Sequence, residues 1–351
     1  MRKIKIHLKK VICLSFLLTG SFIFAAKTKT PVMPDWINTP AAVYPSSSYI
    51  TYVGYGADRD SAEIKALQGI ASVFGQSIKS DSESSQRMIQ AKSEGKIATT
   101  NISSFNQNIL RSVDVNNLIG VEIKEFWFDG TSSWYAIAVL DKSKAFDIYN
   151  DMIKKNAAAI STILENNADD LNSFDGYAAY DFAEDIAVEN ENHLKKISVI
   201  KPDSVSTVKS YCVSSKELHA KKIEIAKNIP ICISVENDVD GKLTSAFSES
   251  TASLGFRSTD DKSARYILSA TVHLERSDTS DGKTTRCRYN ISTYILDFET
   301  NQQLAPFTAT GREGHISYEE AKNRAIKSAE AKIRKDFKKS FSDYLKTIVV
   351  E

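Results

Sequence analysis

Hydrophobic residues along the chain change repeatedly from strand-like to helix-like spacing. This predicts a mixture of short strands and amphipathic helices. The segment YITYVGYG ends on glycines, and apolar residues at helical spacing follow it. The elements predicted for this part of the chain are a strand at 49–56, a helix from Ala62 to Ile78, strands at 113–128 and 133–141 with Gly130 at the turn, and a helix from Ala145.

The middle of the chain has a different character. Residues 156–200 are fairly polar but carry a loose apolar stripe, which predicts a helical hairpin connecting two domains. Residues 201–216 contain Pro202 and many serines, so they form the predicted linker. A second domain is expected from Glu217. Its predicted elements are a strand at 230–235, a helix at 243–254, a meander of strands at 266–274, 288–298 and 303–310, and a long helix after Ser317.

Each half of the chain contains one predicted helix that begins with a similar arrangement of residues. Each half has alanines four residues apart, and such small residues let a helix lie close to a sheet. The pairs are Ala62 with Ala66, and Ala321 with Ala325. Each helix is also preceded by a predicted capping box, in which two side chains satisfy the free backbone amides of the first turn. The boxes are Asp60 with Glu63, and Ser317 with Glu320.

These patterns predict an α+β protein with two small β-α-β-meander-α domains joined by a helical segment. A chain of 351 residues is long enough for two or three domains. The predicted divisions are a signal peptide at 1–26, an extended leader at 27–48, an α+β domain at 49–155, a helical connector at 156–200, a linker at 201–216 and a second α+β domain at 217–351.

The N-terminus carries the features of a secretory signal. The basic stretch MRKIKIHLKK precedes an apolar run at 11–26, and Ala25 or Ala26 supplies the small residue for cleavage. The alternative is an uncleaved signal anchor, although the run is short for a membrane span. Position 27 is lysine, not the cysteine that a lipoprotein signal requires, so we expect no lipid anchor. The expected location is the periplasm or the periphery of the outer membrane.

The charge balance bears on nucleic-acid binding, and the cysteine content bears on disulfide bonding. Five basic residues precede residue 27, and without them 40 basic residues face 44 acidic ones. This mildly acidic balance gives no electrostatic footprint for nucleic acid. The cysteines after the signal are Cys212, Cys232 and Cys287. Their spacing allows one disulfide with one thiol left over, or three thiols acting as small apolar side chains.

No motif of catalytic or ligand-binding residues stands out. The histidines are scattered, and Gly54-Tyr55-Gly56 lacks the third glycine of a dinucleotide turn. Asp238 and Asp240 precede Gly241 without the further ligands of a calcium loop, so a turn and helix cap is predicted there. We therefore expect no catalytic residue, no cofactor and no metal site.

Two tryptophans are candidates for partner binding. Trp127 and Trp134 flank the predicted hairpin turn and can face opposite surfaces of the sheet. They can belong to the core, or they can form an exposed aromatic patch that binds a partner.

Two stretches resemble known families. In the first, the residues are Pro34-Asp35-Trp36, the glycine-containing strand at 52–56 and the WYAIAVL segment at 134–140. On these, residues 35–155 resemble the Lpp-twenty type of bacterial envelope lipoprotein and are similar to the N-terminal domain of the flagellar protein FlgT. The order of strand, helix, meander and long helix makes residues 217–345 similar to the N-terminal domain of TolB and the periplasmic part of CsgG. The resemblances imply binding to other proteins at or near the outer membrane, and they imply no catalytic residues.

We therefore expect an exported, non-enzymatic protein of the cell envelope that acts as a protein-interaction or assembly scaffold. Its expected partners are envelope proteins, or peptidoglycan and outer-membrane components. A first alternative is an accessory subunit of a flagellar or secretion assembly. A second alternative is a hydrolase acting on an envelope polymer, which would need two close carboxylates with separated pKa values.

Overall fold

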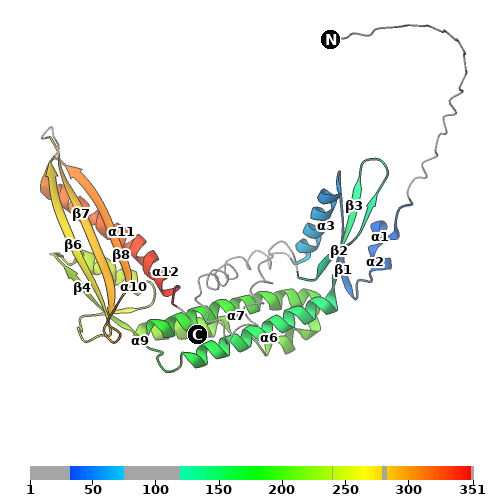
Figure 1. Ribbon diagram of the computed structural model, residues 1–351, viewed down its shortest axis with the longest axis horizontal. Coiled ribbons are helices and arrows are strands. Elements are labelled where there is room, and N and C mark those ends of the chain that lie inside the picture. Colours follow the sequence, from blue (N-terminus) through cyan, green and yellow to red (C-terminus); the bar gives the residue numbers. More distant parts are fainter. Residues whose placement is uncertain (1–31, 75–118, 239, 279–282, 349–351) are drawn as a thin grey trace, which may run out of the picture.

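The computed structural model describes residues 32–74, 119–238, 240–278 and 283–348. The predicted signal peptide lies outside these ranges, as does the first part of the strand predicted at 113–128. Two α/β bodies stand at the ends of a long helical segment (Figure 1). The chain is α+β, as its hydrophobic pattern predicts. None of the helices in the described ranges is long and apolar enough to cross a membrane.

The N-terminal body is a three-stranded antiparallel sheet covered on both faces. Its elements are α1 (Asp35–Asn38), α2 (Pro40–Val43), β1 (Tyr49–Gly56), α3 (Arg59–Phe74), β2 (Val121–Phe128) and β3 (Trp134–Asp141). The strand order β1-β3-β2 places the apolar β3 in the centre. Helix α3 packs on one face, and α1 and α2 lie against the other.

The predicted extended leader is wrong for residues 35–43, which form α1 and α2. Trp36 explains why the chain folds there, because its side chain is only 2% exposed and packs on Ile137 and Val139 of β3. The Trp36 Nε1 donates a hydrogen bond of 2.9 Å to Glu125 Oε2. A buried tryptophan with a satisfied N–H therefore holds this segment on the sheet.

Helix α3 lies very close to β1, as its small residues predict. A Cβ on Gly54 would overlap the Ala62 carbonyl oxygen and the Ala66 amide, and both alanines are fully buried. The predicted cap at Asp60 is wrong by two residues. The Asp58 carboxylate instead accepts a hydrogen bond of 2.6 Å from the Ser61 amide.

The C-terminal body is a five-stranded mixed sheet with helices on one face. Its elements are α9 (Ser215–Asn228), β4 (Pro230–Glu236), α10 (Lys242–Ala252), β5 (Arg257–Thr259), β6 (Tyr266–Asp278), β7 (Thr285–Asp297), β8 (Gln302–His315), α11 (Tyr318–Lys332), a π-helical turn (Ile333–Phe337) and α12 (Lys338–Leu345). The strand order is β5-β4-β6-β7-β8. The first three strands are parallel, and the last three form the predicted antiparallel meander. Ser317 precedes α11 without a side-chain cap, so the second predicted capping box does not form.

Helices α6 and α7 connect the two bodies, and α9, the first helix of the C-terminal body, packs along α7. We call these three helices the bridge. Helix α6 (Lys142–Asn166) leads away from the N-terminal body, α7 (Phe174–Ile200) returns, and α9 runs along α7 towards the C-terminal body. Helix α6 is continuous, so the predicted division between residues 155 and 156 falls inside a helix. Asp141 caps it by accepting hydrogen bonds from the Ser143 and Lys144 amides.

The predicted linker at 201–216 is also partly helical. It contains a short 3₁₀ helix (Pro202–Ser204) and α8 (Val205–Lys209). Val208 is buried in the core of the N-terminal body. This segment therefore turns the chain at the N-terminal body and is anchored to it before α9 begins.

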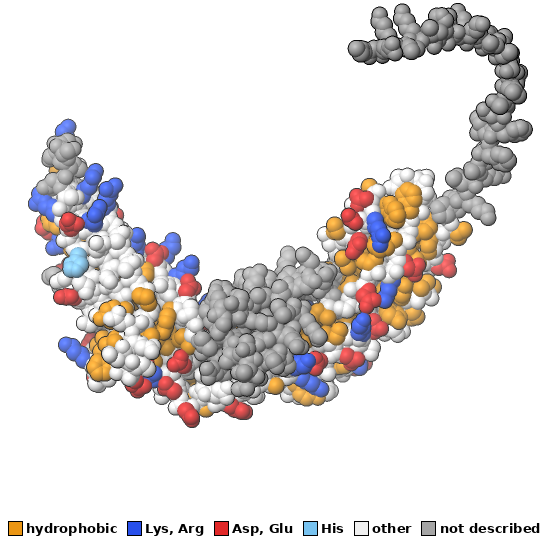
Figure 2. Space-filling view, in the orientation of Figure 1, with side chains coloured by type: hydrophobic (Ala, Val, Ile, Leu, Met, Phe, Trp, Pro, Cys, Tyr) orange, Lys and Arg blue, Asp and Glu red, His pale blue; other side chains and the backbone are white. Residues whose placement is uncertain are grey.

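The bridge shares a hydrophobic core with each body. At one end Tyr149 and Met152 of α6 and Ile197 of α7 pack with α3 and β3. At the other end Phe174 of α7 stacks on Tyr266 of β6 with ring centroids 3.8 Å apart. The Phe174 amide also donates a hydrogen bond of 3.1 Å to the Tyr266 hydroxyl. Both bodies rise from the same side of the bridge, so the molecule has the shape of a shallow U (Figure 1, Figure 2).

We expect Phe174→Ala to lower the free energy of unfolding by roughly 3–5 kcal/mol, because it leaves a cavity where α7 enters the core of the C-terminal body. Phe298→Ala is the matched control, since Phe298 lies in the same body but is 64% exposed. The control should change stability by less than about 0.5 kcal/mol. Urea denaturation followed by circular dichroism measures both. Equal losses for the two variants would contradict the shared core.

Candidate functional site

The two candidate tryptophans lie on opposite faces of the N-terminal sheet. Trp127 pairs with Tyr135, whereas Trp134 pairs with Phe128, so the pleat directs the two indoles to different sides. Trp127 packs with the Trp36 cluster, and Trp134 packs on the α3 side. The predicted opposite orientation is confirmed. The two side chains are half-buried and cannot form one patch, and their role in partner binding stays a prediction.

A hollow lies at the open edge of β1. It has a volume of about 390 Å³ and is lined by residues 52–55 of β1 and by one stripe of α3. The stripe consists of Lys65, Gln68, Gly69 and Ser72, which lie on one side of the helix because their spacing matches its period. We call this concavity the β1-edge groove.

Two tyrosines form the strand side of the β1-edge groove. Tyr52 is 45% exposed and Tyr55 is 61% exposed. The Tyr52 ring lies directly on Gly69. A Cβ at position 69 would overlap the ring, so this ring position requires a glycine. The Lys65 Nζ lies 4.8 Å from the centroid of the Tyr55 ring. Figure 2 shows hydrophobic side chains gathered on the surface of this body.

Sequence reasoning identified β1 and α3 but not the groove between them. The spacing of apolar residues in β1 shows that it is a strand, but not that it is an edge strand of the sheet. That position follows from the order β1-β3-β2, which depends on pairing with residues 78 to 92 positions away.

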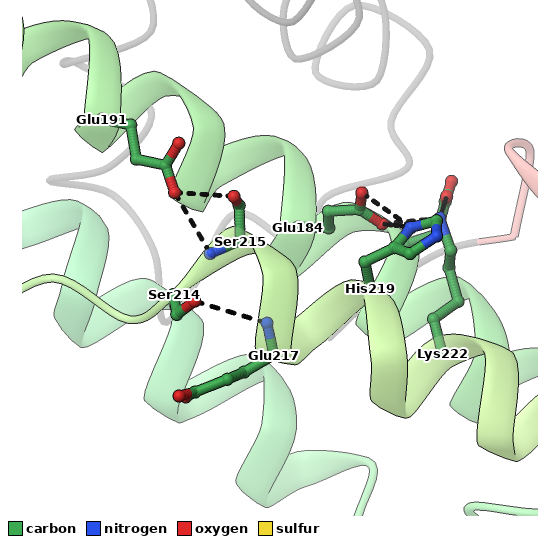
Figure 3. Close-up of polar contacts among 8 residues, drawn as sticks. Glu184, Glu191, Ser214, Ser215, Glu217, His219 and Lys222 are labelled. Atoms are coloured by element: carbon green, nitrogen blue, oxygen red, sulfur yellow. Dashed lines mark hydrogen bonds and ion pairs between the residues drawn. The ribbon is translucent and has the colours of Figure 1, made fainter.

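A polar network joins α7 to α9 inside the bridge (Figure 3). Lys222 of α9 donates hydrogen bonds to Asp181 Oδ1 at 2.9 Å and Glu184 Oε2 at 2.6 Å. Burial alone would lower the pKa of Lys222, but the two carboxylates outweigh it and raise the pKa. His219 Nδ1 lies 3.1 Å from Glu184 Oε1. These contacts hold α9 in one position along α7.

The start of α9 is tied to α7 as well. Ser215 donates to Glu191 Oε1 from its hydroxyl at 2.6 Å and from its amide at 3.3 Å. The Ser214 hydroxyl caps the helix by accepting a bond from the Glu217 amide (Figure 3). These hydrogen bonds fix the first turn of α9 against α7.

Arg265 joins the turn between α6 and α7 to the C-terminal sheet. Its guanidinium contacts Asp170 at 2.8 Å, Asp297 at 3.2 Å and Glu299 at 3.0 Å. Burial raises the pKa of the neighbouring Asp175. Burial would also raise the pKa of Asp297, but hydrogen bonds from Arg265 outweigh it and lower that pKa.

These carboxylates bear on the hydrolase alternative, which needs two carboxylates of separated pKa. Asp175 and Asp297 have opposite shifts, but Arg265 engages Asp297 in an ion pair. The ion pairs of Arg265, which join the bridge to the C-terminal sheet, account for this group of carboxylates. The hydrolase alternative stays a hypothesis.

The cysteines and the acidic residues before α10 are the remaining candidates for chemistry. Cys212, Cys232 and Cys287 are free thiols, and burial raises the pKa of each. The Asp238 carboxylate accepts bonds of 2.8 Å from the amide and hydroxyl of Thr244, which confirms the predicted helix cap. Within the described ranges, no group of three or more His, Cys, Asp or Glu residues is placed to hold a metal ion.

The centre of the bridge contains buried polar side chains. Asn156 of α6 donates a hydrogen bond of 2.8 Å to Asn190 of α7. His193 is 1% exposed, with its Nε2 3.6 Å from Glu189 Oε1. Burial lowers the pKa of His193 well below its usual value, and Lys196 lowers it further. The folded protein therefore keeps this imidazole neutral.

Comparisons with known proteins give weak, partial likenesses. The sequence matches no protein-family model and no curated protein. The secreted protein HP1454 from Helicobacter pylori is 13% identical with a TM-score of 0.43, and the match covers 82% of this chain and 97% of that one. A minor lipoprotein from Acinetobacter baumannii is 14% identical with a TM-score of 0.24, over 34% of this chain and 90% of that one. The rare lipoprotein B from Shewanella oneidensis is 13% identical with a TM-score of 0.24, over 32% of this chain and 92% of that one.

These neighbours are secreted proteins or lipoproteins by name. The resemblances to the Lpp-twenty, FlgT, TolB and CsgG families stay predictions.

We expect Lys222→Ala to lower the free energy of unfolding by about 2–3 kcal/mol, because it removes the ammonium that bonds to both Asp181 and Glu184 in a largely buried place. Lys221→Ala is the matched control. Lys221 also pairs with a glutamate, Glu224, but that pair is exposed. Such a pair contributes less than about 1 kcal/mol. Urea denaturation compares the two, and a larger loss for the control would contradict a stabilising network.

We expect stability to fall as pH drops below about 6.5, where a histidine in the unfolded chain takes up a proton but buried His193 does not. The contribution of neutral His193 is complete above that pH. It is lost by about 1.4 kcal/mol per pH unit below it, until the lowered folded-state pKa is reached. Denaturation between pH 7.5 and 5.5 measures the slope. His193→Gln should flatten it, whereas His273→Gln, at an exposed strand position, should not.

Proposed function

We propose that this chain is an exported cell-envelope protein that acts as a non-enzymatic scaffold for other proteins. The basic and apolar N-terminal sequence supports export. In this proposal, each α/β body offers a docking surface, and the bridge sets the distance between the two surfaces. The partners are proteins of the envelope.

The observation that carries the proposal is the shared core at each end of the bridge. Helix α7 has 27 residues, which corresponds to a length of about 40 Å. Its first turn is buried in the C-terminal body and its last turn in the N-terminal body. Domains joined by a flexible linker would sample many distances, whereas this bridge holds two surfaces at one distance. A fixed spacing favours partners that engage both bodies together.

Site-specific photo-crosslinking in intact cells tests this proposal. A crosslinking amino acid is placed at Tyr55 of β1, at Asn290 on the exposed face of β7, or at Ser161 on the exposed side of α6. We expect defined adducts with envelope proteins from the first two positions and none from the bridge position. Each body would then contact a partner.

The same adducts must appear when crosslinking is repeated on the isolated periplasmic and membrane fractions. A full-length protein that is exported and folded, yet gives no adduct from either body, would contradict a scaffold role. Adducts of equal strength from all three positions would indicate non-specific contact and would also count against it.

A further inference from the structure

We propose that the β1-edge groove binds an extended segment of a partner protein as an added strand, with alternating acidic and apolar side chains. The acidic side chains face α3 and Lys65, and the apolar ones pack on Val53 and Tyr55. This inference rests on the proposed scaffold function, because it names the chemistry of the partner at one of the two bodies.

Alternate backbone N–H and C=O groups of β1 face the groove. The Lys142 amide donates to the Ser48 carbonyl at 2.9 Å, so Ser48 and Lys142 form a hydrogen-bonded pair of the β1–β3 ladder. Such pairs alternate along an antiparallel ladder. The even-numbered residues of β1 therefore bond to β3. The N–H and C=O groups of Thr51, Val53 and Tyr55 point away from the sheet, and among the described residues no other strand pairs with them.

Within the described residues, the edge of β1 lacks the protection that the other sheet edges have. Native edges are blunted by charge, proline, bulges or short length. Strand β2 has three charged residues and a bulge, β5 has three residues in all, and β8 contains a proline and a positive φ at Ala305. The sequence of β1, YITYVGYG, has no charge and no proline over eight residues. A strand with these properties is a template for pairing with another chain.

The groove beside this edge selects the side chains of the added strand. Alternate side chains of an added strand point to opposite faces of the sheet. On the α3 face they would enter the hollow between β1 and α3 and meet Gln68 and Ser72, with the Lys65 ammonium at the Tyr55 end of the hollow. A carboxylate there would pair with the Lys65 ammonium. On the other face they would lie against Val53 and the exposed Tyr55 ring, which suits apolar side chains.

The charge of the groove favours a different protein over a second copy of this chain. Pairing of β1 with β1 of another copy would bring no acidic residue to Lys65, because β1 has none. The segment that fills the groove is about four residues long, since residues 52–55 and one face of α3 from Lys65 to Ser72 line it. Peptides bound in this way obtain affinity from backbone bonds and specificity from alternate side chains.

The test uses the mature-length protein and a fluorescent peptide of alternating valine and glutamate, with the same peptide carrying lysine for glutamate as a control. Fluorescence anisotropy measures the dissociation constants at low salt. We expect binding of the glutamate peptide and at least about tenfold weaker binding of the lysine peptide. Lys65→Glu should weaken binding of the glutamate peptide by about tenfold or more. Lys216→Glu, the same charge change at an exposed position of α9, should leave it unchanged.

A second variant tests whether the outward-facing backbone N–H of β1 binds the peptide. Val53→Pro removes a donor that points away from the sheet and leaves the ladder to β3 intact, so the fold is retained and the added strand is lost. Circular dichroism checks the fold, and Lys65→Glu stands as the independent variant. Equal binding of both peptides, or binding unaffected by Val53→Pro and by Lys65→Glu, would overturn the proposal.

Two further outcomes separate this inference from the scaffold function. Crosslinks from Tyr55 in cells should disappear in Lys65→Glu while those from Asn290 persist. If the Tyr55 crosslinks also persist, the scaffold function stands but the β1-edge groove is not its docking site. A concentration-dependent dimer in sedimentation that Val53→Pro abolishes would assign the edge to a second copy of this chain and overturn the proposal.

Discussion

The stack of Phe174 on Tyr266 is the contact on which the arrangement of the molecule depends. It fixes the first turn of α7 in the core of the C-terminal body, with an aromatic pair and a hydrogen bond from the same residue. The last turn of α7 ends in the other core, where Ile197 and Ile200 are buried. One helix thus belongs to two cores. The two bodies cannot move apart without exposing apolar side chains at one end of that helix.

Polar contacts give the bridge its register. The helices meet through alanines and larger apolar residues such as Ile163, Phe182 and Leu218, and such contacts are non-directional. The bond between Asn156 and Asn190 and the pairing of Lys222 with two carboxylates each satisfy buried polar groups in one alignment only. The apolar contacts supply most of the stabilisation, and the polar ones select one arrangement among similar ones.

The rigid frame and helix α3 restrict which segments can pair with the exposed edge of β1. A free strand edge on a loosely tethered domain invites uncontrolled association. Here the edge stands at one end of a U-shaped frame, with α3 beside it to restrict what can pair. The same close packing that brings α3 onto β1 through Gly54 and Ala62 also forms the groove wall. Packing inside the body and selectivity at its surface therefore have a common origin.

The sequence by itself determined the α+β class, the hairpin between two bodies and most of the strands and helices, because the periodicity of apolar residues is a local property. It missed helix α9 and the short strand β5. It could not reveal that residues 35–43 fold around Trp36, since the partners of that indole are in a strand a hundred residues later. The edge position of β1, the groove beside it and the pairing of Lys222 with Asp181 arise from contacts between distant segments. Such contacts depend on strand order and helix packing, which only the tertiary structure decides.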